Sequence, residues 1–349
     1  MSEARFAPSE GDWDPPADWQ AIRTVDAHAA GEPLRVILRG VPRLEGPTML
    51  DRRRQAEDRL DGLRRTLMWE PRGHADMYGC LLTEPESATS DFGVLFLHNA
   101  GWSTMCGHGI IAVATVALEV GIVPARGPET VVHIDSPAGP IRAVAEVDRG
   151  RVARVRFRNV PSFVLTRDRH VDVAGLGRVR YDVAYGGAFY AFVDAAQLGL
   201  TCRPDEVERL IDAGRAIKRA VSEAMPIRHP DSDDLSFLYG TIFVAPPLQG
   251  ADSRNVCIFA NGEVDRSPTG TGVSARMALH RARGELSVGE SMRIESLLGT
   301  SFVGRAVEDT VVGPYEAVIP EVEGTAYITG THTFVVDPDD PLRAGFILR

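Results

Sequence analysis

The sequence predicts an α+β protein of two pseudo-symmetric lobes, each a mostly antiparallel sheet around one central helix, with a cleft between them. Two observations predict this fold. Three short segments recur in the same order at nearly constant separation, which indicates two copies of one structural unit. Segments with strand-like composition also far outnumber long helical patterns, and both kinds are distributed over the two halves of the chain.

The internal repeat is the stronger of the two observations. Each match alone is weak, but the shared order and an offset of 155, 160 or 163 residues make chance a poor explanation. The matched pairs are residues 29–38 with 184–193, residues 104–121 with the segment that begins at 267, and residues 134–139 with 294–299.

The predicted elements follow the chain in order. Strand-like runs bounded by Gly, Pro, Asn and Asp cover residues 92–99, 130–135, 151–160, 190–195, 240–247, 255–260 and 325–337. Helical patterns cover residues 51–68, 107–120, 203–225 and 270–283. The helices at 107–120 and 270–283 belong to the repeat, and each is followed by a glycine, Gly121 or Gly284, where a left-handed cap would end it.

The domain boundaries follow from the repeat. We expect residues 1–20, which are acidic and Pro-rich, to form a mobile leader, and residues 21–150 to form the first lobe. Residues 151–324 form the second lobe, and the C-terminal segment, about 325–349, is a candidate for returning to the first.

Composition excludes several classes of function. A net charge of −10 argues against a nucleic-acid partner, and no apolar run is long enough to span a membrane. The four cysteines have no metal-ligand spacing, and in a chain without an export signal they indicate reduced thiols in the cytoplasm. These are Cys80, Cys106, Cys202 and Cys257.

The chain contains a single lysine, Lys218, in an amphipathic helical pattern where a solvated position is expected. Pyridoxal phosphate enzymes need a lysine for their Schiff base, so that chemistry is not expected here. We expect no cofactor and no metal, and the oligomeric state is left open, with a homodimer as one possibility.

The two matched loops form the candidate site. Each opens a helix whose first N–H groups lack partners within the helix, and glycine lets that backbone approach a ligand closely. Two such N-termini facing each other would bind a small carboxylate through Gly107, His108, Gly270 and Thr271. Cys106 begins the first helix, where the positive end of the helix dipole is expected to lower the pKa of its thiol and suit it to act as a base.

Four segments carry a resemblance to a known family. The segments MCGHGIIAVATVALEVG, EPRGHADMYG, DSPAGPIRA and DRSPTGTGVSARMALHRARGEL are similar to the proline racemase family, which includes hydroxyproline epimerases. The resemblance covers roughly residues 22–345. It implies the two-lobed fold shared with diaminopimelate epimerase, an active site in the cleft and catalysis without a cofactor.

The resemblance also identifies a departure from the family pattern. In the racemases and epimerases two cysteines lie on opposite faces of a proline ring, one removing the α-proton and the other delivering a proton. Cys106 matches the first cysteine, whereas Thr269 stands where the second is expected. A threonine hydroxyl is far too weak an acid for this exchange. Family members with threonine there resemble trans-3-hydroxy-L-proline dehydratases, which lose the 3-hydroxyl and form Δ1-pyrroline-2-carboxylate.

The roles implied by this resemblance are as follows. Cys106 is the base for the α-proton, and Asp265 binds the ring ammonium. Thr269 either orients the 3-hydroxyl or a water, or fills the space of the missing thiol. The acid that protonates the departing hydroxide is not evident, and His108 is a candidate by proximity alone. Two alternatives stay open: a proline racemase or hydroxyproline 2-epimerase that uses Cys106 and a second acid, and a non-catalytic imino-acid-binding protein.

Overall fold

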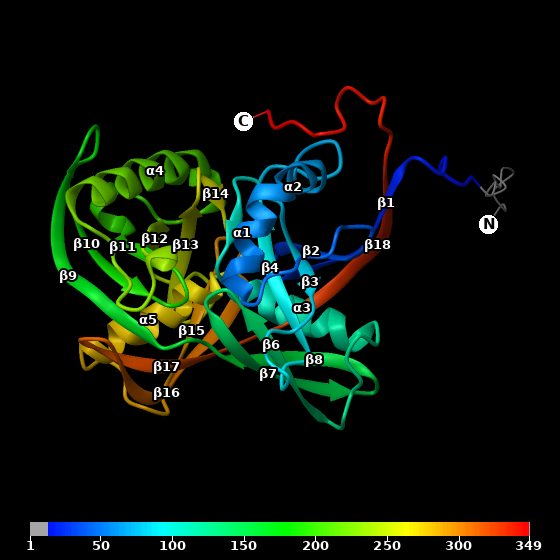
Figure 1. Cartoon of the computed structure of the whole chain (residues 1–349). Coiled ribbons are helices and arrows are strands. Elements are labelled where there is room, and N and C mark those ends of the chain that lie inside the picture. The colour runs from blue at the N-terminus through cyan, green and yellow to red at the C-terminus, as the bar shows by residue number, and fades with distance from the viewer. Residues whose placement is uncertain (1–12, 349) are drawn as a thin grey trace, which may run out of the picture.

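The computed structural model describes residues 13–348. Residues 1–12, most of the expected leader, and residue 349 lie outside the described part of the chain. The molecule has two halves that lie side by side, one with α1, α2 and α3 and the other with α4 and α5 (Figure 1). This arrangement confirms the predicted two-lobed α+β fold.

The first copy of the repeat runs from β1 to β8. Its strands pair in the order β1–β2 antiparallel, β2–β3 parallel, β3–β4 antiparallel, β4–β6 parallel, then β6–β7 and β7–β8 antiparallel. The elements are β1 (Gln20–Ala29), β2 (Glu32–Arg39), α1 (Met49–Arg59), α2 (Asp61–Met68), β3 (Tyr78–Thr83), β4 (Phe92–His98), β5 (Trp102–Ser103), α3 (Gly107–Glu119), β6 (Glu129–Ser136), β7 (Gly139–Asp148) and β8 (Arg151–Arg158).

The second copy repeats this sequence of pairings step by step. β10–β11 is antiparallel, β11–β12 parallel, β12–β13 antiparallel, β13–β15 parallel, and β15–β16 and β16–β17 antiparallel. The elements are β9 (Ser162–Val173), β10 (Gly177–Tyr185), β11 (Phe189–Asp194), α4 (Val207–Ala224), β12 (Leu238–Ala245), β13 (Ser253–Phe259), β14 (Glu263–Val264), α5 (Gly270–Ala282), β15 (Ser291–Glu295), β16 (Ser301–Val312) and β17 (Tyr315–Gly324), with 3-10 turns at Ala195–Leu198, Pro204–Glu206 and Asp233–Leu235.

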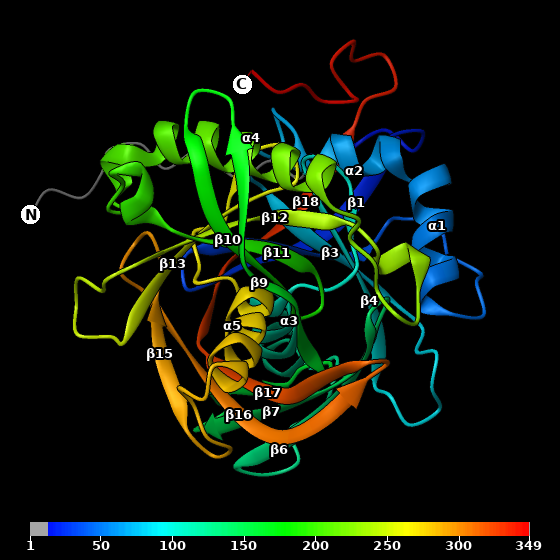
Figure 2. The same ribbon diagram turned by 90° about the vertical axis from the view of Figure 1, so that its left-hand side faces the viewer.

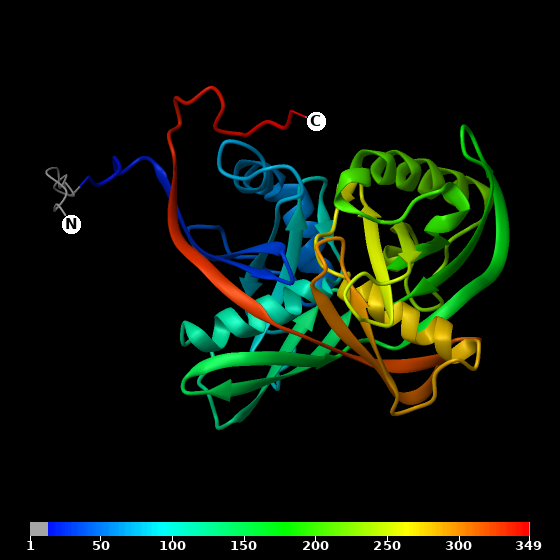
Figure 3. The ribbon, with the colours of Figure 1, turned by 180° about the vertical axis from the view of Figure 1, so that it is seen from behind.

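Two ladders connect the copies. β8 pairs with β17 across the middle of the molecule, and the last strand, β18 (Ala326–Val336), leaves the second half to pair with β1 along its whole length. Figure 3 shows β18 in red passing in front of α3 to reach β1. In the second copy β9 takes the place of β18, because it pairs with β10 as β18 pairs with β1. The lobe boundaries at residues 150 and 324 remain a prediction.

The two matched helices are the buried centres of the halves. Every residue of α3 from Gly107 to Leu118 is buried, and α5 is buried from Gly270 to Leu279. Figure 2 shows the two helices one in front of the other above the curved strands. Gly121 and Gly284 follow them with φ of 76° and 70°, the left-handed conformation predicted for their caps. The larger hydrophobic core surrounds these helices, and a smaller one lies beneath α1 and α2.

Two local expectations need correction. The helical pattern at 51–68 forms two helices, because Leu60 breaks the helix between α1 and α2. Lys218 is not a solvated surface residue: its side chain is half-buried on α4, and its Nζ donates to the Ala260 carbonyl at 2.6 Å. Burial lowers the pKa of this amine, with the charge of Glu263 opposing the shift.

Across residues 13–348, none of the helices has the length and apolar character that a membrane-spanning segment requires.

Candidate active site

All seven residues predicted for the site line one small cavity. Its volume is about 20 Å³, far below the 300–1,000 Å³ typical of pockets for drug-sized ligands, so any ligand that it binds has few atoms. The predicted residues at its wall are Cys106, Gly107, His108, Asp265, Thr269, Gly270 and Thr271. Their roles in binding and catalysis remain predictions.

The N-termini of α3 and α5 meet at two glycines. A Cβ placed on Gly107 would lie 2.4 Å from the Cα of Gly270, and a Cβ on Gly270 would lie 2.6 Å from the Cα of Gly107. No side chain fits at either position without moving a backbone. The close approach directs both positive helix ends at the same cavity, which favours an anionic ligand.

Cys106 occupies the N-cap of α3. Its Sγ accepts a hydrogen bond from the Gly109 N–H at 3.3 Å and lies 3.2 Å from Nδ1 of His108. The Tyr78 ring packs edge-on against the His108 ring, with centroids 4.8 Å apart. We call Tyr78, Cys106 and His108 the Cys106 side of the cavity.

Thr269 occupies the matched N-cap of α5, with a different environment. Its φ of 65° is unusual for a β-branched residue, and its side chain makes no capping bond. The buried Oγ1 has no hydrogen-bond partner of normal geometry among the described residues, yet it is near enough to Asp265 and Cys257 to lower the pKa of each. Tyr190, Cys257 and Thr269 form the Thr269 side of the cavity.

Asp265 is a buried carboxylate at the cavity wall. Burial raises its pKa to about 6, opposed by hydrogen bonds from Ser267 and Thr269 and by the charge of Arg266. The Ser267 N–H donates to Oδ1 at 2.7 Å. Above pH 6 this carboxylate is therefore a buried negative charge that faces the cavity and can bind a cationic ligand group.

The expectation that the helix N-terminus lowers the pKa of Cys106 is wrong for the unliganded site. Burial raises the pKa of this thiol well above its ordinary value and the charge of Asp265 adds to the rise, while the Gly109 N–H and the Tyr78 hydroxyl oppose it. Burial also lowers the pKa of His108 to about 3, against an opposing hydrogen bond to Pro33, so its imidazole is neutral at physiological pH.

An aromatic wall completes the cavity and was not predicted from the sequence. Tyr239 and Phe259 stack with centroids 5.4 Å apart, and Tyr190 packs edge-on against Tyr239. The Tyr190 hydroxyl is 2.7 Å from Oγ1 of Thr271. Two of these aromatic residues lie in segments that the sequence singled out, Tyr78 in a motif shared with the family and Tyr190 in the repeated segment 184–193, but nothing in either segment indicated that the ring faces the site.

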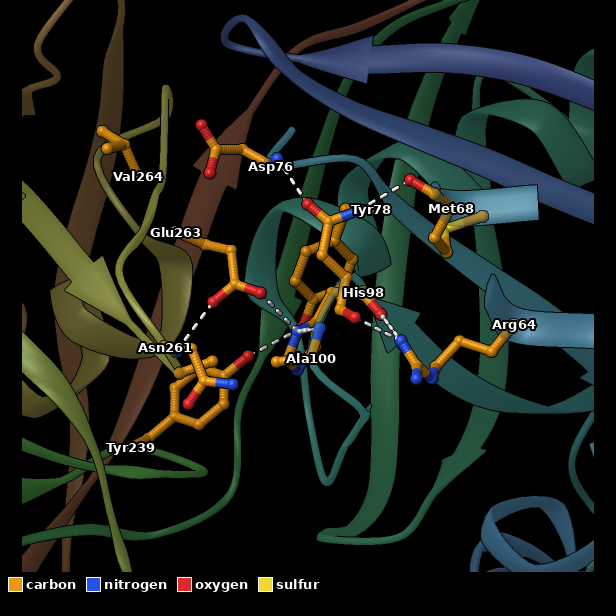
Figure 4. Close-up of polar contacts among 12 residues, drawn as sticks. Arg64, Met68, Asp76, Tyr78, His98, Ala100, Tyr239, Asn261, Glu263 and Val264 are labelled. Carbon is orange, nitrogen blue, oxygen red and sulfur yellow. Dashed lines mark hydrogen bonds and ion pairs between the residues drawn. The ribbon is translucent and has the colours of Figure 1, made fainter. Parts of the chain in front are cut away.

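Contacts between the two halves surround the aromatic wall (Figure 4). The Tyr78 and Tyr239 hydroxyl groups lie 3.3 Å apart, and His98 Nδ1 lies 3.5 Å from the Glu263 carboxylate. Burial alone would raise the pKa of Glu263, but His98 and the Asn261 N–H outweigh it, and the net shift is downward. These contacts hold the cavity closed between the halves.

A second group of contacts between the halves lies around Arg266. Its guanidinium is 2.9 Å from Asp76, and its backbone N–H donates to Glu32 at 2.6 Å. Glu32 is completely buried, and burial together with the charge of Asp265 raises its pKa well above the ordinary value.

Among residues 13–348, no three His, Cys, Asp or Glu side chains are arranged to hold a metal ion.

Known proteins share both the sequence and the fold. A trans-3-hydroxy-L-proline dehydratase from Colwellia psychrerythraea is 48% identical over 97% of this chain and 96% of its own length. A 3-hydroxyproline 2-epimerase from Burkholderia multivorans is 47% identical over 95% of this chain and 99% of its own. The crystal structure of a hydroxyproline epimerase from Agrobacterium vitis with bound trans-4-OH-L-proline superimposes with a TM-score of 0.90, at 34% identity, and covers 95% of this chain and 96% of that one.

The family assignment agrees with these likenesses. The model of the family described as proline racemase matches residues 24–347, which include both helix N-termini, the aromatic wall and the strand β18. The chain therefore belongs to the proline racemase family.

Proposed function

We propose that this protein is a trans-3-hydroxy-L-proline dehydratase. The observation that carries the proposal is the inequality of the two matched helix N-caps, one a thiol (Cys106) and the other an alcohol (Thr269), at the wall of one cavity. Several relatives at 46–48% identity over nearly the whole chain, from bacteria and from a frog, are dehydratases of this substrate.

The charges of the cavity suit a cyclic amino acid. The substrate carboxylate binds the backbone N–H groups of Gly107, His108, Gly270 and Thr271, where two positive helix ends converge. The ring ammonium binds the Asp265 carboxylate, and the apolar ring carbons contact the aromatic wall. This orientation places Cα between Cys106 and Thr269.

The reaction begins with removal of the α-proton by the Cys106 thiolate. The electron pair left on Cα forms a C2–C3 double bond as the C3–O bond breaks, and the 3-hydroxyl leaves with one proton as water. The resulting enamine tautomerises to Δ1-pyrroline-2-carboxylate. These steps conserve atoms and electrons without a cofactor, and we place the reaction in the cytoplasm because the cysteines are unpaired thiols.

Substrate binding helps to ionise Cys106. The charge of Asp265 disfavours a second anion at the nearby thiol. The positive charge of the ring ammonium offsets that of Asp265, so the pKa of Cys106 falls when this group binds. Substrate binding therefore favours the thiolate form of Cys106, which is the base for the α-proton.

The second candidate function is 3-hydroxyproline 2-epimerisation, because one close relative has that activity. An epimerase must deliver a proton to the face of Cα opposite the base. On that side the cavity offers the Thr269 hydroxyl and the Cys257 thiol, and burial raises the pKa of Cys257 well above its ordinary value. The N-cap matched to Cys106 carries a hydroxyl, a far weaker acid than a thiol, which favours elimination.

The test is incubation of the purified protein with trans-3-hydroxy-L-proline. A dehydratase forms the cyclic imine, detected with o-aminobenzaldehyde or by coupled reduction. Chromatography on a chiral column would detect the D-epimer in the same sample. Epimer without imine would assign the protein to the second candidate, and binding with no product of either kind would leave only an imino-acid-binding protein.

A further inference from the structure

The stereochemistry of the substrate determines from which face the hydroxyl departs. In an L-amino acid ring, the α-hydrogen and the carboxylate are on opposite faces at C2. The trans isomer carries its 3-hydroxyl on the face opposite the carboxylate, which is the face of the α-hydrogen. Whatever group removes the α-proton therefore lies on the face from which the hydroxyl leaves, and this inference rests on the proposed function.

The proposed function assigns removal of the α-proton to Cys106, and a tyrosine hydroxyl lies beside this thiol. Cys106 lies beside His108, and Tyr78 packs against the same imidazole. The Tyr78 hydroxyl is near enough to Cys106 to affect the pKa of the thiol, and it is 3.3 Å from the Tyr239 hydroxyl. Tyr78 and Tyr239 both line the cavity, so this hydroxyl pair adjoins the space on the Cys106 side.

The other polar groups of the cavity are poorly suited to protonate the hydroxide. His108 is neutral, since burial lowers its pKa to about 3. Asp265 is ionised above pH 6 and is occupied by the ring ammonium. Thr269 and the Cys257 thiol belong to the opposite side, away from the departing hydroxyl, and Tyr190 there is engaged with Thr271. The thiol formed when Cys106 accepts the α-proton is the acid nearest to the departing oxygen.

We propose that water is lost by syn elimination on the Cys106 side, where the Tyr78 hydroxyl holds the 3-hydroxyl and the new Cys106 thiol returns its proton to the departing oxygen. The S–H and C3–O bonds break, the O–H and C2–C3 π bonds form, and the thiolate is regenerated. One residue is base and acid in turn, so the opposite face needs no proton donor. Thr269 then fills the space of the missing thiol and does not hold the 3-hydroxyl.

A pair of substrate isomers tests this inference. In cis-3-hydroxy-L-proline the α-hydrogen still faces Cys106, but the hydroxyl faces Thr269. We expect the trans isomer to form the imine and the cis isomer to form it at least about 100-fold more slowly, which corresponds to about 2.7 kcal/mol of barrier. In D2O the cis isomer should still acquire deuterium at Cα, because Cys106 can reach that hydrogen.

Each outcome has a definite meaning. Comparable dehydration of both isomers would overturn the syn elimination, because it would require an acid on the Thr269 side. Dehydration of neither isomer would instead overturn the proposed function, and this inference with it. The two failures are therefore distinguishable.

Two tyrosine variants separate binding of the 3-hydroxyl from general packing. Tyr78→Phe should lower kcat/KM for trans-3-hydroxy-L-proline about tenfold or more, since the 3-hydroxyl loses its partner. Its Kd for pyrrole-2-carboxylate, a planar mimic without that hydroxyl, should change less than about twofold. Tyr190→Phe is the matched control on the Thr269 side, and it should weaken substrate and mimic alike, because Tyr190 supports Thr271 at the carboxylate site. If Tyr78→Phe behaves as Tyr190→Phe does, Tyr78 does not hold the hydroxyl.

Discussion

The N-termini of α3 and α5 both begin with a glycine but differ at the N-cap, where φ is −146° for Cys106 and 65° for Thr269. Both begin at a glycine that touches its counterpart, and both lie at the same cavity. Cys106 caps one helix with hydrogen-bonded sulfur, while Thr269 caps the other with a strained backbone and a hydroxyl that has no partner of normal geometry among residues 13–348. In the proposed function, binding and proton transfer are therefore separable: both copies would bind the carboxylate, and one alone would supply the base.

The largest expected effect tests the unequal N-caps directly. Cys106→Ser should lower kcat about 10³-fold or more, because a serine hydroxyl cannot remove the α-proton at neutral pH. Thr269→Ser should lower kcat only a few-fold, because it removes one methyl group and no proton donor. Initial rates of imine formation measure both. Equal losses from the two variants would contradict the proposed difference between the N-caps. Cys80→Ala, which alters a buried thiol that does not line the cavity, should retain activity.

The next effect tests whether the two helix N-termini contribute equally to binding of the carboxylate. Gly107→Ala and Gly270→Ala should weaken pyrrole-2-carboxylate binding to a similar extent, up to about 100-fold, because each new methyl forces the helix ends apart. Titration calorimetry would measure the two Kd values. Gly62→Ala is a suitable control, since a Cβ there meets no atom within 4 Å, and it should stabilise α2 slightly. A large effect from one glycine alone would contradict a shared cradle.

A third effect concerns the carboxylate that serves both sides. Asp265 must be ionised to bind the ring ammonium, and its raised pKa is about 6. The value of kcat/KM should therefore fall as the pH drops through about 6, where the carboxylate takes up a proton and loses its charge. Asp265→Asn should lower kcat/KM about tenfold or more and abolish this acidic limb. A variant that keeps the limb would show that another group is responsible.

The smallest effect is a gain of activity. Thr269→Cys restores a thiol to the second N-cap, and we expect slow but measurable epimerisation at Cα beside the dehydration. Chiral chromatography of the remaining substrate would detect it against the unmodified protein, which should form none. Absence of the epimer would show that the Thr269 side differs from a racemase by more than one atom, as its backbone φ of 65° suggests.

Sequence reasoning identified the parts of the site that reside in contiguous loops. The glycines of the two helix N-termini and Cys106 lie in the repeat, so spacing and order were enough to find them, whereas Asp265 was assigned from the resemblance to the family. The aromatic wall was not predicted, because Tyr190, Tyr239 and Phe259 come from three separate strands and meet only in the folded protein.

The expected pKa of Cys106 failed for a related reason. The helix dipole is a local property that can be read from sequence, whereas desolvation and the charge of Asp265 depend on the closed cavity. The fold itself was predictable because one repeat implies both halves. The break at Leu60 and the partly buried position of Lys218 depend on packing and were not.

The ladder between β1 and β18 has a consequence for synthesis of the protein. Gln20 pairs with Val336 and Ala29 with Ala326, so β1 meets this neighbour only after all the strands and helices from β2 to β17 have been made. Contacts so distant in sequence form slowly, and until then the outer edge of β1 is exposed to other strands. Nascent chains halted before residue 326 should therefore depend on chaperones more than the released protein does.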